Sequence, residues 1–261
     1  KLFFLLLAPL LLNAKKVDSL KKLFYTSNNK NLQTEYCLEL MQLTWRQSID
    51  TSISWGEMAR MYAKASKDSL IYAKSSRGLG NLYKLKKDYT KAFFHFFNAQ
   101  NTFKKAKDHK NYALTSRSIA VLYYNLEDYI KSQLHYHKAI DGFNKVKNVY
   151  DKADYEKAGI LCNIGIIQMI TKDLQSAKQS FKKSLAIYKR KNITVKNAMI
   201  YLNLGYVYME EDSLEKALEI QLKAFDYLDK EKDIETYADL LNNIGSIHFK
   251  NKAYTQAKEF Y

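Results

Sequence analysis

Residues 79–99 read LGNLYKLKKDYTKAFFHFFNA, and their small and bulky positions return along the chain in one register. Small residues return with spacings of 40, 45, 40 and 40, at Gly80, Ala120, Gly165, Gly205 and Gly245. A bulky residue follows each of them nine positions later, and another small residue follows twelve positions later. Sixteen positions later the chain has Phe96, Tyr136, Phe181, Gln221 and Tyr261. A fixed period of this length predicts a chain built from repeated structural units.

The composition indicates that these units are helical. The chain has 261 residues, of which 47% are hydrophobic, and its one proline is Pro9. Hairpin dipeptides among its eight glycines are limited to Asp141-Gly142, so β-strands would lack the turns that connect them. We therefore expect an all-α fold with enough apolar residues for an extended core.

Each repeat is expected to contain two antiparallel helices, for example over residues 73–86 and 89–107. Helix axes pack about 8–10 Å apart, and the closest approaches require glycine or alanine. Gly80 and Ala92 are therefore expected at helix contacts, with aromatic residues such as Phe96 filling the space around them. One helix pair cannot bury its apolar face alone, so the pairs stack and share a continuous core.

The string Leu79-Gly80-x-x-Tyr83, followed by Asp88-Tyr89-x-x-Ala92-x-x-x-Phe96-x-x-Ala99, resembles the tetratricopeptide repeat. The period departs from that pattern, being about 40 rather than roughly 34 residues, and the usual closing proline is missing. The longer period resembles the repeats of kinesin light chains and of bacterial peptide-sensing regulators. The resemblance implies an α-α superhelix whose first helices line a concave groove that binds a protein or peptide. The repeats are expected over residues 33–72, 73–112, 113–157, 158–197 and 198–237, with a truncated repeat over 238–261.

The first fourteen residues have the pattern of a secretory signal peptide. Lys1 precedes the apolar run LFFLLLAPLLL of residues 2–12, and the small residue Ala14 precedes Lys15. A basic start, a short apolar run and a small residue at its end are typical of such signals, and the run is shorter than the roughly 20 residues of a membrane span. We expect cleavage near Ala14 and export to an extracytoplasmic compartment. Residues 15–32 are then expected to form an N-terminal capping helix.

A signal segment followed by an Asp18-Ser19-Leu20 helix and repeats of 40 residues resembles the extracytoplasmic sensor regions of Bacteroidetes-type signalling proteins. In that group a membrane helix and a kinase or helix-turn-helix module often follow. The repeat that ends at Tyr261 is incomplete, which favours a longer parent protein and a membrane link only through a further C-terminal segment. Two alternatives remain, a self-contained secreted adaptor and an intracellular peptide-sensing regulator.

The positive net charge does not by itself predict a nucleic-acid partner. Lys and Arg number 42 against 27 Asp and Glu, a net charge of +15, but only five of the basic residues are arginine. Arginine forks are the side chains that readers of bases and phosphates favour. We therefore expect a solvated lysine surface and no nucleic acid.

Three asparagines occupy one equivalent position, two residues before the glycine of a first helix: Asn163, Asn203 and Asn243. A side-chain amide can donate to and accept from a peptide backbone at once. Groove proteins with similarly long repeats use asparagines at this position to hold an extended peptide. The alternative is that each asparagine bonds the neighbouring repeat.

Basic residues gather on the first helices of the early repeats. The groove residues expected there are Lys74, Arg77, Asn81, Lys84 and Arg117. The later first helices bring acidic residues instead, at Glu210, Glu211 and Asp239. Such a gradient would orient a peptide and favour an acidic segment near Arg77, whereas the alternative is that these are ordinary solvated helix faces.

No pattern in the chain predicts catalysis, a metal or a cofactor. His135 and His137 lie two apart and diverge on a helix, and the sequence has no nucleophile motif or phosphate loop. Cys37 and Cys162 fall three repeats apart, beyond the reach of a disulfide, and are expected to be buried thiols. We expect a binding protein and no enzyme.

Overall fold

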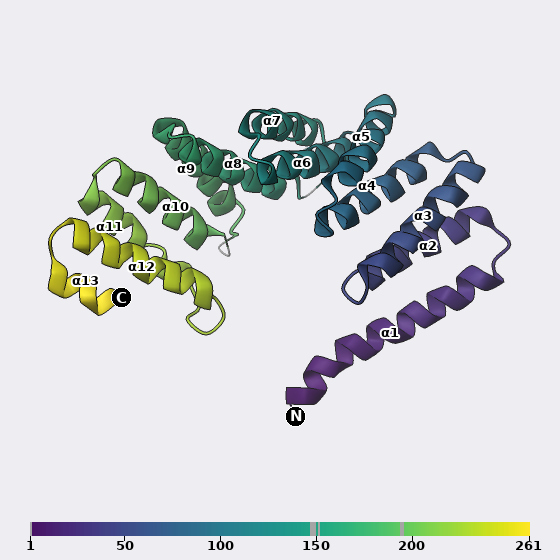
Figure 1. The fold of residues 1–261 in the computed structure, drawn as a ribbon, viewed down its shortest axis with the longest axis horizontal. Coiled ribbons are helices and arrows are strands. Elements are labelled where there is room, and N and C mark those ends of the chain that lie inside the picture. Colours follow the sequence, from purple (N-terminus) through teal and green to yellow (C-terminus); the bar gives the residue numbers. More distant parts are fainter. Residues whose placement is uncertain (1, 147–149, 151, 194–195) are drawn as a thin grey trace. The chain divides into compact units, whose positions relative to one another are not determined.

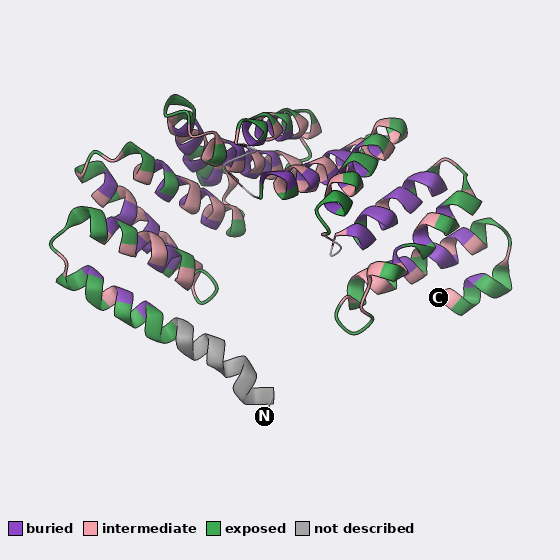
Figure 2. Ribbon diagram, turned by 180° about the vertical axis from the view of Figure 1, so that it is seen from behind, coloured by how far each residue is buried: buried purple, intermediate pink, exposed green. Residues whose placement is uncertain are grey.

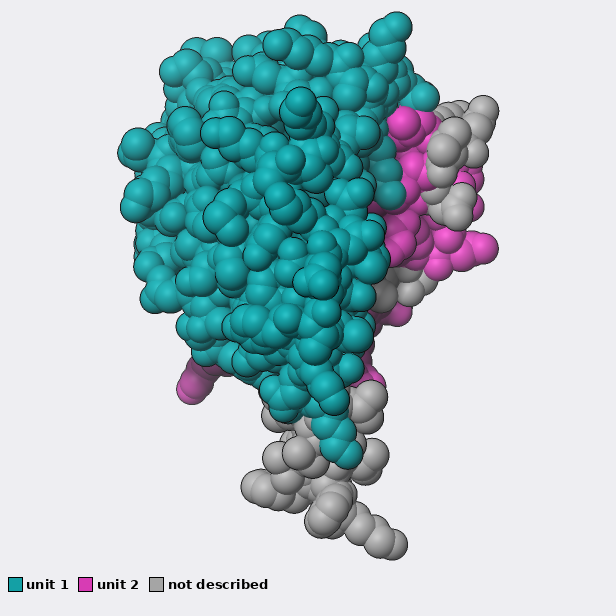
Figure 3. Space-filling model, turned by 90° about the vertical axis from the view of Figure 1, so that its right-hand side faces the viewer, with its two compact units in different colours: residues 1–145 teal, residues 146–261 magenta. Residues whose placement is uncertain are grey.

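The computed structural model describes residues 2–146, 150, 152–193 and 196–261, and for residues 2–13 it describes the backbone alone. Over these ranges the chain forms thirteen α-helices and one short 3₁₀ helix, without any strand, which confirms the all-α fold (Figure 1). The helices form two compact units, residues 1–145 and 146–261 (Figure 3). The two units are described one at a time below.

The first unit contains three helix pairs preceded by one long helix. Its helices are α1 (Leu2–Thr26), α2 (Lys30–Thr44), α3 (Ile49–Ala65), α4 (Ser69–Leu85), α5 (Tyr89–Lys105), α6 (His109–Asn125) and α7 (Tyr129–Lys145). The pairs are α2 with α3, α4 with α5, and α6 with α7, and the closest packing in the unit lies within them. The first helices of successive pairs also touch, α2 with α4 and α4 with α6, and therefore form one continuous layer.

The second unit repeats this arrangement. Its helices are α8 (Ala153–Ile170), α9 (Leu174–Arg190), α10 (Asn197–Glu210), α11 (Leu214–Leu222), α12 (Ile234–Lys250) and α13 (Tyr254–Phe260), with the 3₁₀ helix η1 (Phe225–Tyr227) after α11. The first helices α8, α10 and α12 again contact one another in order. Most first helices begin four or five residues before the repeat boundaries expected from the sequence register; α4, for example, begins at Ser69 and not at residue 73.

The helix ends follow a regular pattern that explains these boundaries. Most turns between helices contain a non-glycine residue with positive φ: Lys67, Lys87, Lys107, Glu127, Lys172, Asn192, Asp212 and Lys252. This left-handed residue ends one helix. The residue that follows is often aspartate, whose carboxylate caps the next helix by accepting a backbone N–H three residues on, as Asp68 does from Ile71 at 2.9 Å and Asp108 from Asn111 at 3.0 Å.

The core is built from the columns that the sequence register predicts. A Cβ atom at Gly80 would lie 2.6 Å from the Phe96 ring, and one at Gly165 would lie 2.7 Å from Phe181. The glycine of this column in α4, α8, α10 and α12 therefore lies directly against the side chain of the residue sixteen positions later. Where serine replaces alanine twelve positions after the small residue, it donates into the first helix, as Ser132 Oγ does to Ala120 O at 2.9 Å. Buried residues accordingly gather on the helix faces turned toward their neighbours (Figure 2).

The N-terminal prediction is only partly covered by the structure. The signal segment, residues 1–14, lies almost wholly outside the described side chains, and α1 continues beyond it to Thr26. Val17, Leu20 and Phe24 of α1 are buried, and the Phe24 ring packs edge-on against Trp55 of α3 at 5.4 Å. Because α1 ends at Thr26 and α2 begins at Lys30, the expected capping segment 15–32 spans two helices. None of the described helices combines the length and the apolarity that crossing a membrane requires.

Candidate binding surface on the first helices

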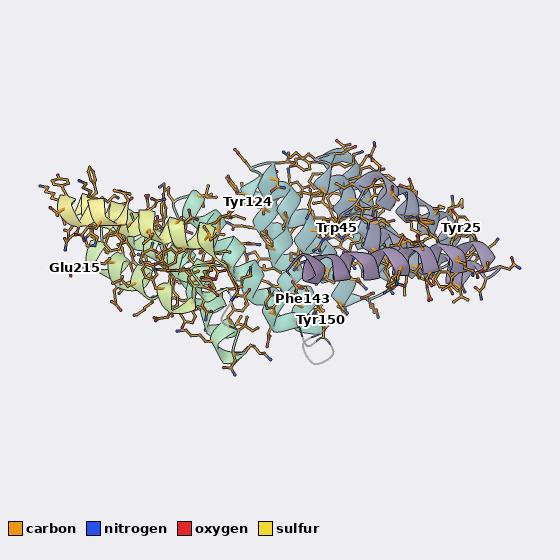
Figure 4. All side chains as sticks on the ribbon, turned by 90° about the horizontal axis from the view of Figure 1, so that it is seen from below. Tyr25, Trp45, Tyr124, Phe143, Tyr150 and Glu215 are labelled. Atoms are coloured by element: carbon orange, nitrogen blue, oxygen red, sulfur yellow. The ribbon has the colours of Figure 1, made fainter. Side chains whose placement is uncertain are left out.

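The layer of first helices in the first unit contains an open apolar pocket between α2 and α4. Its volume is about 310 Å³, and its lining consists of Met41, Gln42, Trp45, Gly78, Asn81, Leu82 and Leu85. Trp45 follows directly after α2 and is labelled in Figure 4. Its side chain is 38% exposed, and that of Leu85 is 48% exposed. Two large apolar side chains therefore stand at the mouth of the pocket and not in the core.

Gly78 and Met41 lie against each other in the lining of this pocket. A Cβ atom at Gly78 would lie 2.2 Å from Met41 Cε, so the methionine packs directly on bare backbone of α4. Gly78 occupies the column that carries asparagine in the later repeats. The absence of a side chain at this position is what allows α2 and α4 to approach here.

Polar and basic groups lie on the other side of α4, where it faces α6. The hydroxyl of Ser118 donates to Asn81 Oδ1 at 3.4 Å, which links α6 to a residue that also lines the pocket. Burial and the nearby Arg117 charge lower the pKa of Lys84 from its ordinary value. A lysine whose pKa falls beside an arginine is one of a cluster of like charges. The structure thus brings together three of the predicted groove residues, Asn81, Lys84 and Arg117.

The remaining predicted basic residues lie on the same helix. Lys74 is exposed, Arg77 is half-buried, and both precede Asn81 by the three- or four-residue steps that place side chains on one helix face. Arg77 also makes an interaction of its own within the fold. Of the five basic and amide residues predicted for the first unit, four therefore lie on α4 and Arg117 lies on α6, and Asn81 is the one that lines the pocket.

The three asparagines of the second unit lie on α8, α10 and α12 and are all half-buried. The amide nitrogen of Asn203 is shielded from solvent. It lies beside Cys162 of α8, whose pKa burial raises to about 11, while the Lys196 charge and a hydrogen bond from Asn203 oppose the rise. Asn163 has a partner inside the fold. Asn203 of α10 therefore contacts the neighbouring first helix α8, and Asn163 also interacts within the fold.

The acidic residues expected in the later repeats do not form an acidic surface. Glu210 pairs with Lys172 at 2.5 Å, and Glu211 pairs with Lys178 at 2.7 Å. These ion pairs neutralise two of the three acidic residues, so the expectation of an acidic stretch on α10 was wrong. These ion pairs could not be predicted from the register because each lysine belongs to the turn or the second helix of the preceding repeat.

The apolar pocket was not foreseen from the sequence. The copy over residues 33–72 matches the register only weakly, so the register assigns no binding role to Met41 or Trp45. One signal was available: Trp45 falls five positions after the small-residue column, where the later repeats have Leu85, Asn125, Ile170, Glu210 and Lys250. A tryptophan at a position that is otherwise variable and partly polar indicates a surface role.

The titratable residues provide no reactive constellation in the part of the chain that the structure describes. No group of three or more histidine, cysteine, aspartate or glutamate side chains there is placed to hold a metal ion. Cys37 and Cys162 are free and buried, and burial raises the pKa of the Cys37 thiol to about 12. His95 and His135 are buried among aromatic rings, and burial lowers the pKa of each to about 4. A thiol and an imidazole in such environments stay neutral near pH 7.

Comparison with known proteins identifies the repeats. A tetratricopeptide repeat family model matches residues 158–190, 198–227 and 238–261. The second unit is built from tetratricopeptide repeats. These matches fall on the three helix pairs of that unit, and the first unit has the same pairing of helices. No curated protein matches the chain.

Solved structures with the same fold cover both units. BtubC (BKLC) from P. vanneervenii is 17% identical, with a TM-score of 0.68 over 82% of this chain and 88% of that one. A signal transduction ATPase with a tetratricopeptide repeat sensor, PH0952 from Pyrococcus horikoshii, is 15% identical, with a TM-score of 0.76 over 87% of this chain and 34% of that one. The Rap conjugation regulator of plasmid pLS20, solved in complex with the Phr* peptide, is 20% identical, with a TM-score of 0.57 over 95% of this chain and 72% of that one. At these identities the likeness establishes a tetratricopeptide-like helical solenoid fold.

Proposed function

We propose that this chain is a non-catalytic scaffold that binds a protein or peptide segment along the layer formed by its first helices. The observation that carries the proposal is the open pocket between α2 and α4, because it leaves Trp45 and Leu85 exposed beside the polar side chains of Gln42 and Asn81. Exposed apolar residues with a polar rim are typical of surfaces that bind a partner. The Rap regulator of similar fold was solved with a peptide, which supports the same use of the fold here.

The test is a selection of peptides from an array of randomised twelve-residue sequences, followed by affinity measurements on surface variants. Lys74→Glu alters α4 in the first-helix layer of the first unit, and Tyr206→Glu alters α10 in that of the second unit; both residues are exposed. We expect one of these variants to weaken the binding of a selected peptide at least tenfold. Phe94→Glu, at an exposed position of the second helix α5, is the control and should change affinity less than twofold. Enrichment of no peptide, or loss of binding only in the control, would refute the proposal.

The asparagine column has its own test because two roles are possible for it. The test is the double variant Asn163→Ala with Asn203→Ala. If these asparagines hold a peptide, the variant should bind it more weakly while its thermal midpoint stays nearly unchanged. A role in joining repeats predicts the opposite, a lowered midpoint with the affinity of the remaining folded protein retained. The buried amide of Asn203 supports the second outcome for that residue, and Asn243→Ala isolates the third member of the column.

The cellular role that we propose is the extracytoplasmic sensor region of a larger signalling protein. The apolar segment of residues 2–12 and its flanking lysines support export. N-terminal sequencing of the mature protein after expression should then begin near Lys15, and the protein should appear in the extracytoplasmic fraction. A retained Lys1 in a cytoplasmic protein would favour the intracellular peptide-sensing alternative. A secreted adaptor would share the cleaved N-terminus but would be recovered without a membrane-bound parent.

A further inference from the structure

Another pocket of the first unit lies where the ends of α5, α6 and α7 meet. Its volume is about 290 Å³, and its lining consists of Lys104, His109, Tyr112, Lys138, Asp141, Gly142 and Lys145. It shares no lining residue with the pocket between α2 and α4. Ligand pockets have volumes of roughly 300–1,000 Å³, so a pocket of this size suits a small molecule.

Gly142 brings α6 and α7 together at this pocket. The Asp141-Gly142 dipeptide lies inside α7 and not in a turn, although glycine is less favourable than alanine within a helix. A Cβ atom at Gly142 would lie 2.8 Å from Ala113 Cβ and 3.1 Å from the His109 carbonyl oxygen, so α6 begins directly against bare backbone of α7. Other repeats carry larger residues in this column: Tyr62, Thr102, Ile187 and Tyr227. The close approach at Gly142 therefore distinguishes this repeat from the others.

The lining of this pocket carries more positive than negative charge. Three lysines, Lys104, Lys138 and Lys145, share it with a single carboxylate, that of Asp141, which leaves two positive charges. Within the described part of the chain, none of the three ammonium groups takes part in an ion pair or a hydrogen bond. Like charges around one cavity repel one another, and a bound anion relieves this repulsion.

The turn that leads into α6 does not cancel this charge. Residues 104–110 read KKAKDHK and contain four lysines against one aspartate. That aspartate, Asp108, accepts hydrogen bonds from the backbone and the side chain of Asn111, at 3.0 and 2.7 Å, and does not line the pocket. The surroundings of the pocket therefore remain positive.

The lining also contains a hydroxyl group that the fold does not use. One repeat earlier, Tyr72 is equivalent to Tyr112, and its hydroxyl receives a hydrogen bond from the Arg60 guanidinium at 2.6 Å. Gln100 takes the place of that arginine and donates to Ser116 Oγ at 2.7 Å instead. The Tyr112 hydroxyl is thus left without a hydrogen-bond partner among the described residues. A phenolic hydroxyl can donate to a bound anion.

We propose that this pocket binds a small molecule that carries a phosphate group, with the three lysines and the Tyr112 hydroxyl donating to the phosphate oxygens. A phosphate ester has a charge of about −1.5 to −2 at pH 7, which matches the two positive charges that the lining leaves, and it offers three strong acceptor oxygens. Lysine binds phosphate as a point charge. A single carboxylate would neutralise only half of this charge. The site is separate from the peptide surface proposed above, so its test does not depend on that proposal.

The first experiment is isothermal titration calorimetry of the full chain with glycerol 3-phosphate at low ionic strength, near pH 8, where the phosphate is a dianion. We expect saturable binding at one site, no binding of glycerol, and at least tenfold weaker binding of acetate. Glycerol 3-phosphate should also raise the thermal midpoint, because a ligand of the folded state stabilises it. Absence of binding at millimolar concentrations, or equal affinity for acetate, would overturn the inference.

A pair of lysine variants separates this site from the general positive charge of the protein. Lys104→Gln with Lys145→Gln should weaken the binding of glycerol 3-phosphate at least tenfold, because both residues line the pocket. The control, Lys182→Gln with Lys183→Gln, removes the same charge from exposed positions of α9 and should change the affinity less than twofold. Equal losses in the two variants would show a nonspecific effect of charge and would overturn the site.

A second pair of variants leaves the charge unchanged. Tyr112→Phe removes only the hydroxyl and should weaken the binding of glycerol 3-phosphate at least threefold. Tyr124→Phe, at the other end of α6, is its control and should bind as the unchanged chain does. If Tyr112→Phe binds as tightly as Tyr124→Phe, the phosphate lies elsewhere and the assignment to this pocket is wrong.

Discussion

At the residue scale, the glycines of the first helices show how a sequence column becomes a packing contact. The Phe96 ring occupies the space that a side chain at Gly80 would need, at 2.6 Å from an added Cβ. Gly80→Ala should therefore lower the free energy of unfolding by about 1–3 kcal/mol, as overpacking commonly does. Gly159→Ala is the control, because the nearest atom to its added Cβ is Tyr188 Oη at 3.4 Å. There alanine should stabilise the helix by up to about 1 kcal/mol, and urea unfolding that gives both variants the same sign would refute the packing assignment.

The two buried histidines predict how stability depends on pH. His95 stacks on Tyr83 at 5.2 Å, and burial, then Arg60 and Lys91, lower its pKa to about 4; Glu57 is 3.8 Å away but does not offset this. The unfolded chain binds a proton near pH 6.5 and the folded chain only near pH 4, so stability is complete above pH 6.5 and falls between these values. Each pKa unit is worth about 1.4 kcal/mol.

His135 extends this prediction because it is buried in the same way on α7, beside Tyr123 and Lys138. His95→Phe with His135→Phe should make the urea midpoint less dependent on pH between 6.5 and 4. An equally steep dependence in this variant would show that other groups are responsible.

The contacts of residues that recur in several repeats could be predicted from the sequence, whereas the contacts of residues found in a single repeat could not. The columns of Gly80, Ala92 and Phe96 return in several copies, so their mutual contact followed from helix packing. Trp45 and Gly78 depart from their columns, and their joint pocket depends on the local approach of α2 to α4. The burial of the Asn203 amide could not be predicted either, because an equivalent position in the repeat does not determine which neighbouring residue a side chain contacts.

At the scale of elements, the turns fix where helices begin and end. Lys107 has φ of 55° and Asp108 caps α6, an arrangement that recurs at intervals of about 20 residues. This shorter period is visible in the sequence, in pairs such as Lys67-Asp68 and Lys87-Asp88, but the 40-residue register obscures it. The helix boundaries differed from expectation for this reason.

Substitutions at two adjacent residues of the turn before α6 are expected to change the stability of the fold in opposite directions. Asp108→Ala removes an N-cap and should cost about 1 kcal/mol of stability. Lys107→Gly relieves the left-handed conformation, which glycine adopts readily, and should stabilise the fold by up to about 1 kcal/mol. Thermal unfolding of the two variants tests this, and a destabilised Lys107→Gly would contradict the role assigned to the turn.

Helix α11 differs from α5, α7 and α9 because Gln221 replaces the aromatic residue of its column. Its amide donates to Leu202 O at 3.3 Å, but Oε1 is buried without a partner, and the helix ends at Leu222. A buried polar atom without a partner costs about 1–3 kcal/mol. Gln221→Phe should therefore raise the thermal midpoint and the helical circular dichroism signal. A lower midpoint would mean that the space beside Gly205 does not admit a ring.

At the scale of the whole molecule, the chain is a series of helix pairs whose N-terminal end is covered by α1. The described side chains of α1 that reach the core begin at Val17 and continue to Leu20 and Phe24. A protein that starts at Lys15 should keep the thermal midpoint of the full chain. Removal of residues 1–26 should lower it markedly, since each buried apolar side chain contributes roughly 1.5–3 kcal/mol. Equal midpoints for both truncations would show that α1 does not stabilise the first unit.

We propose that the first helices, and not the second helices, form the binding surface. Its most direct measurement is a cross-linking map with the photoreactive residue benzoylphenylalanine placed singly at Lys74, Tyr206 and Phe94 and irradiated with a peptide enriched from the array. We expect a cross-linked peptide from Lys74 on α4 or Tyr206 on α10, and none from Phe94 on α5. Cross-linking from Phe94 alone would contradict it.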